Sequence, residues 1–238
     1  MTTKTQKTDE VTTKRKRFAL QIALYVNGLV VMAFGIALAI NSNLGITPVT
    51  SFPFAISSVS GIRVGICITV FLLVCIILQI ILLRKEFKWI NLTQIIFATI
   101  FGLFVDAAIF IIGDFSIPTY AGQLTMLAIS ILLVAFGLVS YLDAKLILMP
   151  VEGLTEVIVQ KLNSTFHRVK IAMDCIFVSL AIIITFTFLN EVYGVREGTV
   201  ISAIAIGKLL PASRIFLNMI LRKMRLYDLL NSQQEPEQ

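Results

Sequence analysis

The sequence predicts an all-α polytopic membrane protein in which six transmembrane helices form two inverted three-helix repeats, each with a short non-spanning helix after its first span. Three observations predict this fold. First, 57% of the 238 residues are hydrophobic and only 14% are charged, whereas a soluble domain has about 25% charged residues. Second, the apolar residues form six runs, each close to the roughly 20 residues that a helix needs to cross a bilayer. Third, the second half of the chain repeats features of the first half in the same order.

The six runs set the organisation of the chain. We expect a disordered cytoplasmic tail at 1–17, a first three-span repeat at 18–113, a second three-span repeat at 114–220 and a cytoplasmic tail at 221–238. The predicted spans are 18–40, 64–83, 91–113, 122–142, 169–189 and 198–220. The first run is too long for the apolar region of a signal peptide, which has about 7–15 residues.

The distribution of lysine and arginine predicts the orientation. Basic residues gather in the N-terminal tail and in alternate segments between the spans: Arg84, Lys85, Lys88, Lys145, Lys161, Arg168, Lys170, Arg222, Lys223 and Arg225. The positive-inside rule then places both termini in the cytoplasm. This clustering accounts for the net charge of +6, so the lipid bilayer is an expected partner and nucleic acid is not.

Several kinds of chemistry lack the residues that they need. Cys67, Cys75 and Cys175 all lie in apolar runs and form no metal or redox motif. The single histidine, His167, lies in a predicted cytoplasmic loop, and the sequence contains no nucleotide-binding loop and no catalytic motif. We therefore expect no enzymatic activity, no metal and no cofactor.

The internal repeat is visible as matched residues at nearly constant offsets. Pro48-Val49 returns 102 residues later as Pro150-Val151, and Arg63-Val64 returns 105 residues later as Arg168-Val169. The tripeptide Ala-Phe-Gly that ends at Gly35 returns at Gly137, again 102 residues later. Each copy holds three spans, an odd number, so the second copy enters the membrane from the opposite side. That is the inverted repeat common among secondary transporters.

The segment after the first span of each copy is expected to be a short helix that does not cross the membrane. These segments, 44–60 and 146–163, should begin their helices near Pro48 and Pro150, because proline fits the first helical turn. Thr47 is the expected N-cap, and Gly45 should permit a tight connection from the first span.

Two arrangements of these short helices are compatible with the sequence. They either dip into the membrane and turn back, or lie flat on opposite faces as amphipathic connectors. If they dip and line a solute path, then Thr47, Pro48 and Thr50 should border a polar cavity together with Glu152 from the other half. The free N–H groups of the two helix starts would then favour an anionic group.

The run AFGIALAINSNLGITPVTSFPFAIS, with LGITP at 44–48 as its motif core, resembles the YczE/YitT-type family of bacterial multi-pass membrane proteins. The resemblance covers about residues 20–215. It implies a bacterial plasma-membrane protein, and the family has no assigned biochemical activity. The second copy departs from the motif, because Ile147 replaces the glycine.

Ionisable residues inside the spans are candidates for function, because they are costly to place in lipid. Asp106 and Lys208 lie in the third and sixth spans, which are repeat partners, and we expect them to pair or to act together. Asp174 follows Lys170 by one helical turn, and a simple ion pair is the alternative to a functional role. The candidate substrate-binding residues are Asn41, Gly45, Thr47, Pro48, Thr50, Asp106, Pro150, Glu152, Asp174 and Lys208.

These features favour a small secondary transporter or permease for an unidentified small solute, with an anion as the favoured kind. The alternative is a non-transporting assembly or regulatory partner of another membrane complex, and a lipid-acting intramembrane enzyme is a third hypothesis. The expected partners are therefore the bilayer and a solute, or else a membrane protein or a second copy of the chain.

Overall fold

The computed structural model describes residues 2–223 and Leu226, and the described residues form helices and connecting loops with no strand. The long helices are α1 (Thr2–Ser42), α3 (Val64–Leu83), α4 (Gln94–Ile112), α5 (Tyr120–Asp143), α7 (Phe166–Leu189) and α8 (Glu197–Lys223). The short ones are α2 (Pro48–Ser60) and α6 (Pro150–Leu162), with 3-10 turns η1 (Arg84–Glu86) and η2 (Trp89–Thr93) between α3 and α4. The six long helices are apolar enough to cross a membrane, which confirms the predicted all-α polytopic membrane fold.

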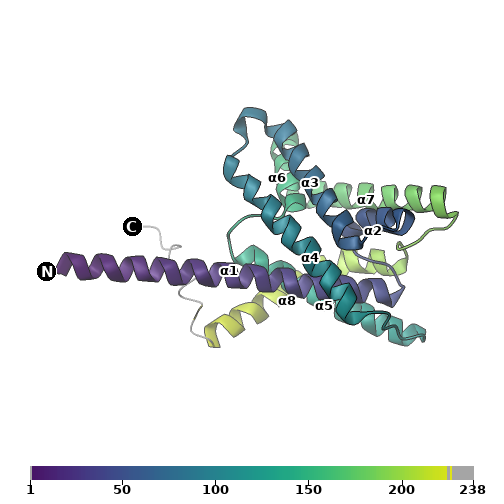
Figure 1. Ribbon diagram of the computed structural model, residues 1–238, viewed down its shortest axis with the longest axis horizontal. Helices are drawn as coiled ribbons and strands as arrows, with labels where there is room; N and C mark the ends of the chain where they lie inside the picture. The colour runs from purple at the N-terminus through teal and green to yellow at the C-terminus, as the bar shows by residue number, and fades with distance from the viewer. Residues whose placement is uncertain (1, 224–225, 227–238) are drawn as a thin grey trace.

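The N-terminal tail differs from the prediction of disorder. Helix α1 begins at Thr2 and continues without interruption into the first span, so that its first part projects beyond the other helices (Figure 1). Residues 1–17 contain neither proline nor glycine, and the helix can therefore extend backwards from the stable span. Most of the predicted C-terminal tail lies outside the described residues.

Helices α2 and α6 are the two short helices that the sequence predicts. Each has 13 residues and starts at its proline, which gives a length of about 20 Å against a hydrocarbon core of about 30 Å. Both start among buried residues and end among exposed ones. Thr47 occupies the N-cap position of α2, but its side chain makes no capping bond. Its hydroxyl lies 2.8 Å from the Thr50 hydroxyl instead, so Thr47 is the N-cap by position, as predicted, but without a capping hydrogen bond.

Contacts between loops define two ends of the molecule. At the first, called the Asn43 end, Asn41 Nδ2 donates to Gly113 O at 2.7 Å, and Arg196 Nη1 donates to Asn43 O at 2.9 Å. At the second, called the Arg84 end, Lys161 pairs with Glu86. The loops are thus distributed as six alternating spans require, and the end that faces the cytoplasm stays a prediction.

Helices α1 and α5 cross at very short range, and their contact is reciprocal. A Cβ added to Gly35 would lie 3.1 Å from Ser130 O, and a Cβ added to Gly137 would lie 2.6 Å from Gly28 O. The repeat offset of 102 residues relates the two pairs, because Gly137 is the counterpart of Gly35 and Ser130 is the counterpart of Gly28. The helices run antiparallel, because residues later in α1 contact residues earlier in α5. An inverted repeat predicts this reciprocity.

The other helix pairs follow the same relation. Helix α2 packs on α7 while its counterpart α6 packs on α3, and α4 packs on α1 while its counterpart α8 packs on α5. The backbone agrees as well, since the positive φ angles of Asn43 and Gly61 recur 102 residues later at Lys145 and Asn163. These observations support the predicted repeat.

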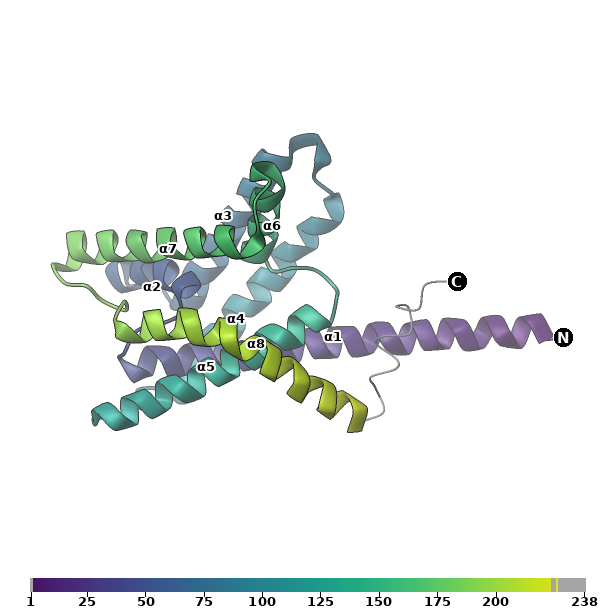
Figure 2. The ribbon, with the colours of Figure 1, turned by 180° about the vertical axis from the view of Figure 1, so that it is seen from behind.

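One helix pair does not follow the repeat symmetry, and the sequence shows the reason. Helices α3 and α4 touch through Gly65 and Gly102, where an added Cβ would overlap the opposite backbone. In the second copy Lys170 stands at the position of Gly65, and Gly207, the counterpart of Gly102, has no atom within 4 Å of an added Cβ. Helix α7 therefore lies along α2 and α8 along α5, rather than against each other (Figure 2).

The largest buried cluster lies where six helices meet, since α5 also contributes Tyr141 to it. It contains Tyr25 of α1, Phe71 of α3, Phe101 of α4, Leu154 of α6 and Phe177 of α7. The short helix α6 thus contributes to the interior of the bundle instead of only covering its surface. Its first turn carries one acidic side chain, that of Glu152.

Candidate functional site

The start of α6 is held inside the bundle by two amide side chains. Gln79 of α3 and Gln94 of α4 are both buried. Gln79 Nε2 donates to Pro150 O at 3.0 Å and to Gln94 Oε1 at 3.1 Å. A Cβ added to Gly153 would lie 3.0 Å from Gln79 Oε1. The packing of α6 on α3, with its first turn buried, therefore favours the dipping arrangement over the flat one.

Glu152 lies in this first turn, and its carboxyl interacts electrostatically with Lys170, Asp174, Tyr141 and Tyr25; these five residues are here called the Glu152 cluster. Burial raises the pKa of the Glu152 carboxyl above its ordinary value, and the positive charge of Lys170 opposes this effect. The helix N-terminus suits a carboxylate, but desolvation outweighs that benefit here.

The tyrosines of the cluster differ in their hydrogen bonding. Tyr25 and Tyr141 are both fully buried and lie edge to face with ring centroids 5.6 Å apart. The Tyr25 hydroxyl donates to Met149 Sδ at 3.4 Å. The Tyr141 hydroxyl, by contrast, is buried and has no hydrogen-bond partner among the described residues.

Asp174 and Lys170 form the ion pair predicted as the simpler interpretation of their spacing. Lys170 Nζ donates to Asp174 Oδ1 at 2.5 Å along α7. The pair lies beside Glu152, so that one cation faces two carboxyl groups. The cluster is electrically neutral only when one of the two carboxyl groups carries a proton.

A second polar region lies at the Asn43 end, where the two halves of the chain meet. Gly45 has a φ of 109°, and an added Cβ would lie 2.6 Å from Thr199 Oγ1 and 2.9 Å from Arg196 N. The Ile46 amide donates to Gly194 O at 3.2 Å. The connection before α2 therefore packs directly on the start of α8, and the expectation that Gly45 permits a close approach is confirmed.

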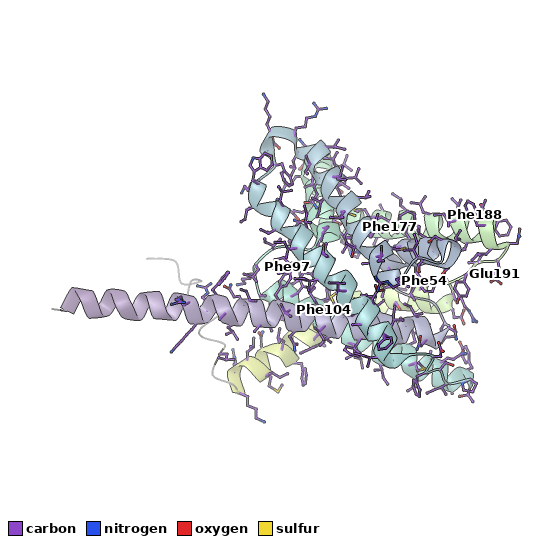
Figure 3. The ribbon with its side chains drawn as sticks, in the orientation of Figure 1. Phe54, Phe97, Phe104, Phe177, Phe188 and Glu191 are labelled. Atoms are coloured by element: carbon purple, nitrogen blue, oxygen red, sulfur yellow. The ribbon has the colours of Figure 1, made fainter. Side chains whose placement is uncertain are left out.

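A cavity of about 200 Å³ lies beside this joint. The residues that line it come from both halves: Ala39, Ile40, Asn43, Gly45, Ile46, Phe54, Val192, Tyr193, Gly194 and Arg196. Phe54 and Tyr193 stack in it with centroids 5.7 Å apart. Phe54 and Glu191 lie at the end of the molecule away from the N-terminus (Figure 3), and they also line a neighbouring hollow.

The structure gives Asp106 a different partner from the one predicted. Asp106 Oδ1 accepts from Gly65 N at 2.7 Å, and Oδ2 lies 3.6 Å from Arg63 Nε. The carboxylate thus binds the start of α3, where the helix dipole favours it. Lys208 is exposed on α8 and has no hydrogen bond or ion pair with any described residue. The prediction that Asp106 and Lys208 pair was therefore wrong.

The remaining candidates have local roles. Asn41 fastens the end of α1 to the loop after α4 through two backbone carbonyls, and Thr47 and Thr50 bond to each other at the start of α2. Neither of the two cavities at the Asn43 end is lined by Thr47, Pro48, Thr50 or Glu152. The polar cavity that was expected to join them is thus not among these two.

Sequence reasoning missed half of the Glu152 cluster and its supports. Tyr25, Gln79, Gln94 and Tyr141 are polar residues inside predicted spans, a signal that was available, but inside the spans only aspartate and lysine residues were candidates. Arg196 was not a candidate either. Among the residues that the structure describes, no group of three metal-ligating side chains gathers.

The comparisons with known proteins agree with this architecture. A model of a family of unknown function, DUF6198, matches residues 19–214. The chain belongs to this family. It is 29% identical over 163 residues to the uncharacterized protein YyaS of Bacillus subtilis strain 168, covering 67% of this chain and 78% of that protein. Over 204 residues it is 24% identical to the uncharacterized membrane protein YczE of the same strain, covering 84% and 87%.

The family match confirms the predicted resemblance to YczE-type proteins, whose function is unassigned. No solved structure matches the chain. The family therefore supports a multi-pass membrane protein, and any more specific function has to be argued from the residues.

Proposed function

We propose that this DUF6198 protein is a secondary transporter for a small anionic solute. One observation carries the proposal: the cavity at the Asn43 end is lined by both halves of the chain, at the joint between the connector before α2 and the start of α8. Secondary transporters built from inverted repeats bind their solutes at the interface between the repeats. A relative movement of the two halves would change the shape of such a cavity directly.

The charges at the cavity favour an anion. Arg196 lines it and is half-exposed, with its guanidinium held by Asn43 O at 2.9 Å and by Glu197 at 3.2 Å. Glu191 lies in the adjacent hollow instead of in this cavity. A guanidinium fixed by two neighbours loses little side-chain freedom when it binds an anion with its remaining N–H groups.

Uptake into sealed proteoliposomes tests the proposal. A panel of radiolabelled small carboxylates, phosphate and sulfate is offered to wild-type protein, to Arg196→Gln and to Arg63→Gln. Arg63 is a matched control, because it is an exposed arginine near the Asn43 end that does not line the cavity. We expect uptake of at least one anion above empty liposomes and a roughly tenfold rise in its KM in Arg196→Gln, or about 1.4 kcal/mol of binding, but not in Arg63→Gln. No uptake by folded protein would contradict transport.

One observation favours the alternative function, a non-transporting partner of another membrane protein. Lys208 lies within α8 on an exposed face next to Gly207, and a lysine there is costly to expose to lipid. A second protein that supplies an acid would remove this cost. Under this alternative, Lys208→Leu dissociates a complex that blue-native electrophoresis detects for the wild type, while monomer stability is unchanged.

A further inference from the structure

We infer that the solute of the cavity at the Asn43 end is a monocarboxylate whose apolar body has the size of a benzene ring. The inference deepens the proposed function, on which it rests for the movement of the solute across the membrane. Its binding chemistry rests on the cavity alone. It separates this class of anion from phosphate, sulfate and dicarboxylates.

Arg196, the charged residue that lines the cavity, has donors left for one carboxylate. Its Nε and Nη2 atoms donate to Glu197 at 3.4 and 3.2 Å, and its Nη1 atom donates to Asn43 O at 2.9 Å. A guanidinium has five N–H groups, so these three bonds leave two unused, and a carboxylate accepts two in a bidentate pair. Since Glu197 already offsets the charge of Arg196, a dianion would leave one more uncompensated charge at the cavity than a monoanion.

Most of the other residues that line the cavity are apolar. Ile40, Ile46 and Val192 lie there beside the stacked rings of Phe54 and Tyr193, and these five side chains are here called the apolar wall. The cavity has a volume of about 200 Å³, and in another protein an apolar cavity of roughly 150 Å³ binds benzene. A ring with one carboxylate therefore fits, with the ring against the apolar wall. A small inorganic anion would leave that wall in contact with water.

The aromatic part of the apolar wall is held in place by its neighbours. Phe54 is buried, and a Cβ added to Gly194 would lie 2.6 Å from the Phe54 ring. Tyr193 stacks on Phe54 with an interplanar angle of 17°. The Ile46 amide fixes the same loop by donating to Gly194 O at 3.2 Å. A solute that packs on rings already fixed in this way loses little affinity to the ordering of side chains.

The neighbouring hollow adds selection against a second negative charge. It shares Ile40, Phe54 and Tyr193 with the cavity, and it is also lined by Glu191, which lies with Phe54 at the end of the molecule away from the N-terminus (Figure 3). A body that extends past the stacked rings therefore brings its far end toward an acidic side chain. A neutral end is accepted there, whereas a second carboxylate is repelled.

Equilibrium dialysis of the purified protein in detergent tests binding without any transport step. The probe is radiolabelled benzoate, and the competitors are benzamide, acetate, sulfate and terephthalate. Benzamide has the shape of benzoate without its charge, acetate has the charge without the ring, and terephthalate carries a second carboxylate. We expect saturable binding of benzoate, with competition by benzamide, acetate and sulfate at least about tenfold weaker than by unlabelled benzoate.

Matched variants connect the binding to the residues, and thermal unfolding checks that each variant folds. Arg196→Gln should weaken benzoate binding about tenfold, whereas Arg63→Gln, outside the cavity, should leave it unchanged. Tyr193→Ala should weaken it about threefold or more, with Tyr120→Ala as the control at another exposed tyrosine. Terephthalate should compete about threefold less well than benzoate in the wild type, and Glu191→Gln should remove this difference.

The outcomes separate this inference from the transport proposal. Benzoate binding that depends on Arg196, in a protein that takes up no anion, would leave the inference standing and refute transport. Uptake of phosphate, sulfate or a dicarboxylate by a protein that does not bind benzoate would overturn the inference and leave transport standing. Competition by benzamide as strong as that by benzoate would show that the carboxylate is not recognised, and would also overturn the inference.

Discussion

Gly45 is the residue on which the joint between the two halves depends. Its φ of 109° is unfavourable for any side chain, and a Cβ would overlap Thr199 and Arg196. We therefore expect Gly45→Ala to lower the free energy of unfolding by about 2–5 kcal/mol, from backbone strain and overpacking together. Thermal unfolding in detergent measures the change.

Gly61 provides the control for that substitution. It also has a positive φ, 70°, but no atom lies within 4 Å of an added Cβ. Gly61→Ala should therefore cost only the backbone strain, about 1 kcal/mol. Equal losses in the two variants would mean that strain alone, and not the contact with α8, explains the glycine at position 45.

At the scale of helices, the contact between α3 and α4 should tolerate no added methyl group. Gly102→Ala places a Cβ against Thr69 Oγ1 and Gly65 O, and we expect it to destabilise the protein by about 1–3 kcal/mol. The matched change in the second repeat, Gly207→Ala, meets nothing and should be neutral or stabilise α8 by up to about 1 kcal/mol. Unfolding of both variants in SDS titrations measures the contrast, and similar losses would rule out the proposed asymmetry.

For the whole molecule, the decisive prediction is that the two repeats have opposite orientations in the membrane. In a variant with Cys67, Cys75 and Cys175 replaced, a cysteine at Tyr120 should react with an impermeant maleimide from outside intact cells. A cysteine at Lys161 should react only after permeabilisation, because both positions are exposed but lie at opposite ends. Labelling of position 161 from outside would overturn the topology and the inverted repeat together.

Much of this architecture was predictable from the sequence, because it depends on short-range properties. Hydropathy sets the six spans, and Pro48 and Pro150 set the starts of α2 and α6, since proline belongs in the first turn. The burial of the start of α6 was not predictable. It depends on Gln79 and Gln94, which are distant in sequence and become neighbours only when α6 packs on α3.

The partner of Asp106 was mispredicted for a related physical reason. Repeat symmetry suggested that the third and sixth spans would meet at Asp106 and Lys208. The pair Gly65 and Gly102 instead brings α3 against α4, so that Asp106 reaches the start of the neighbouring helix first. Small residues fix which helices approach each other, and their effect on a distant charge cannot be obtained from hydropathy or from spacing.

The second repeat has Lys170 where the first has Gly65, and this difference should also make the two repeats unequal in stiffness. Helices α3 and α4, in backbone contact, form a stiff hairpin, whereas α7 and α8 are each attached to a different helix and joined only through residues 190–196. We therefore expect the second repeat, which lies beside the cavity, to be more flexible than the first. Spin labels on α7 and α8 should give a broader distance distribution than labels on α3 and α4, and equal widths would contradict this unequal stiffness.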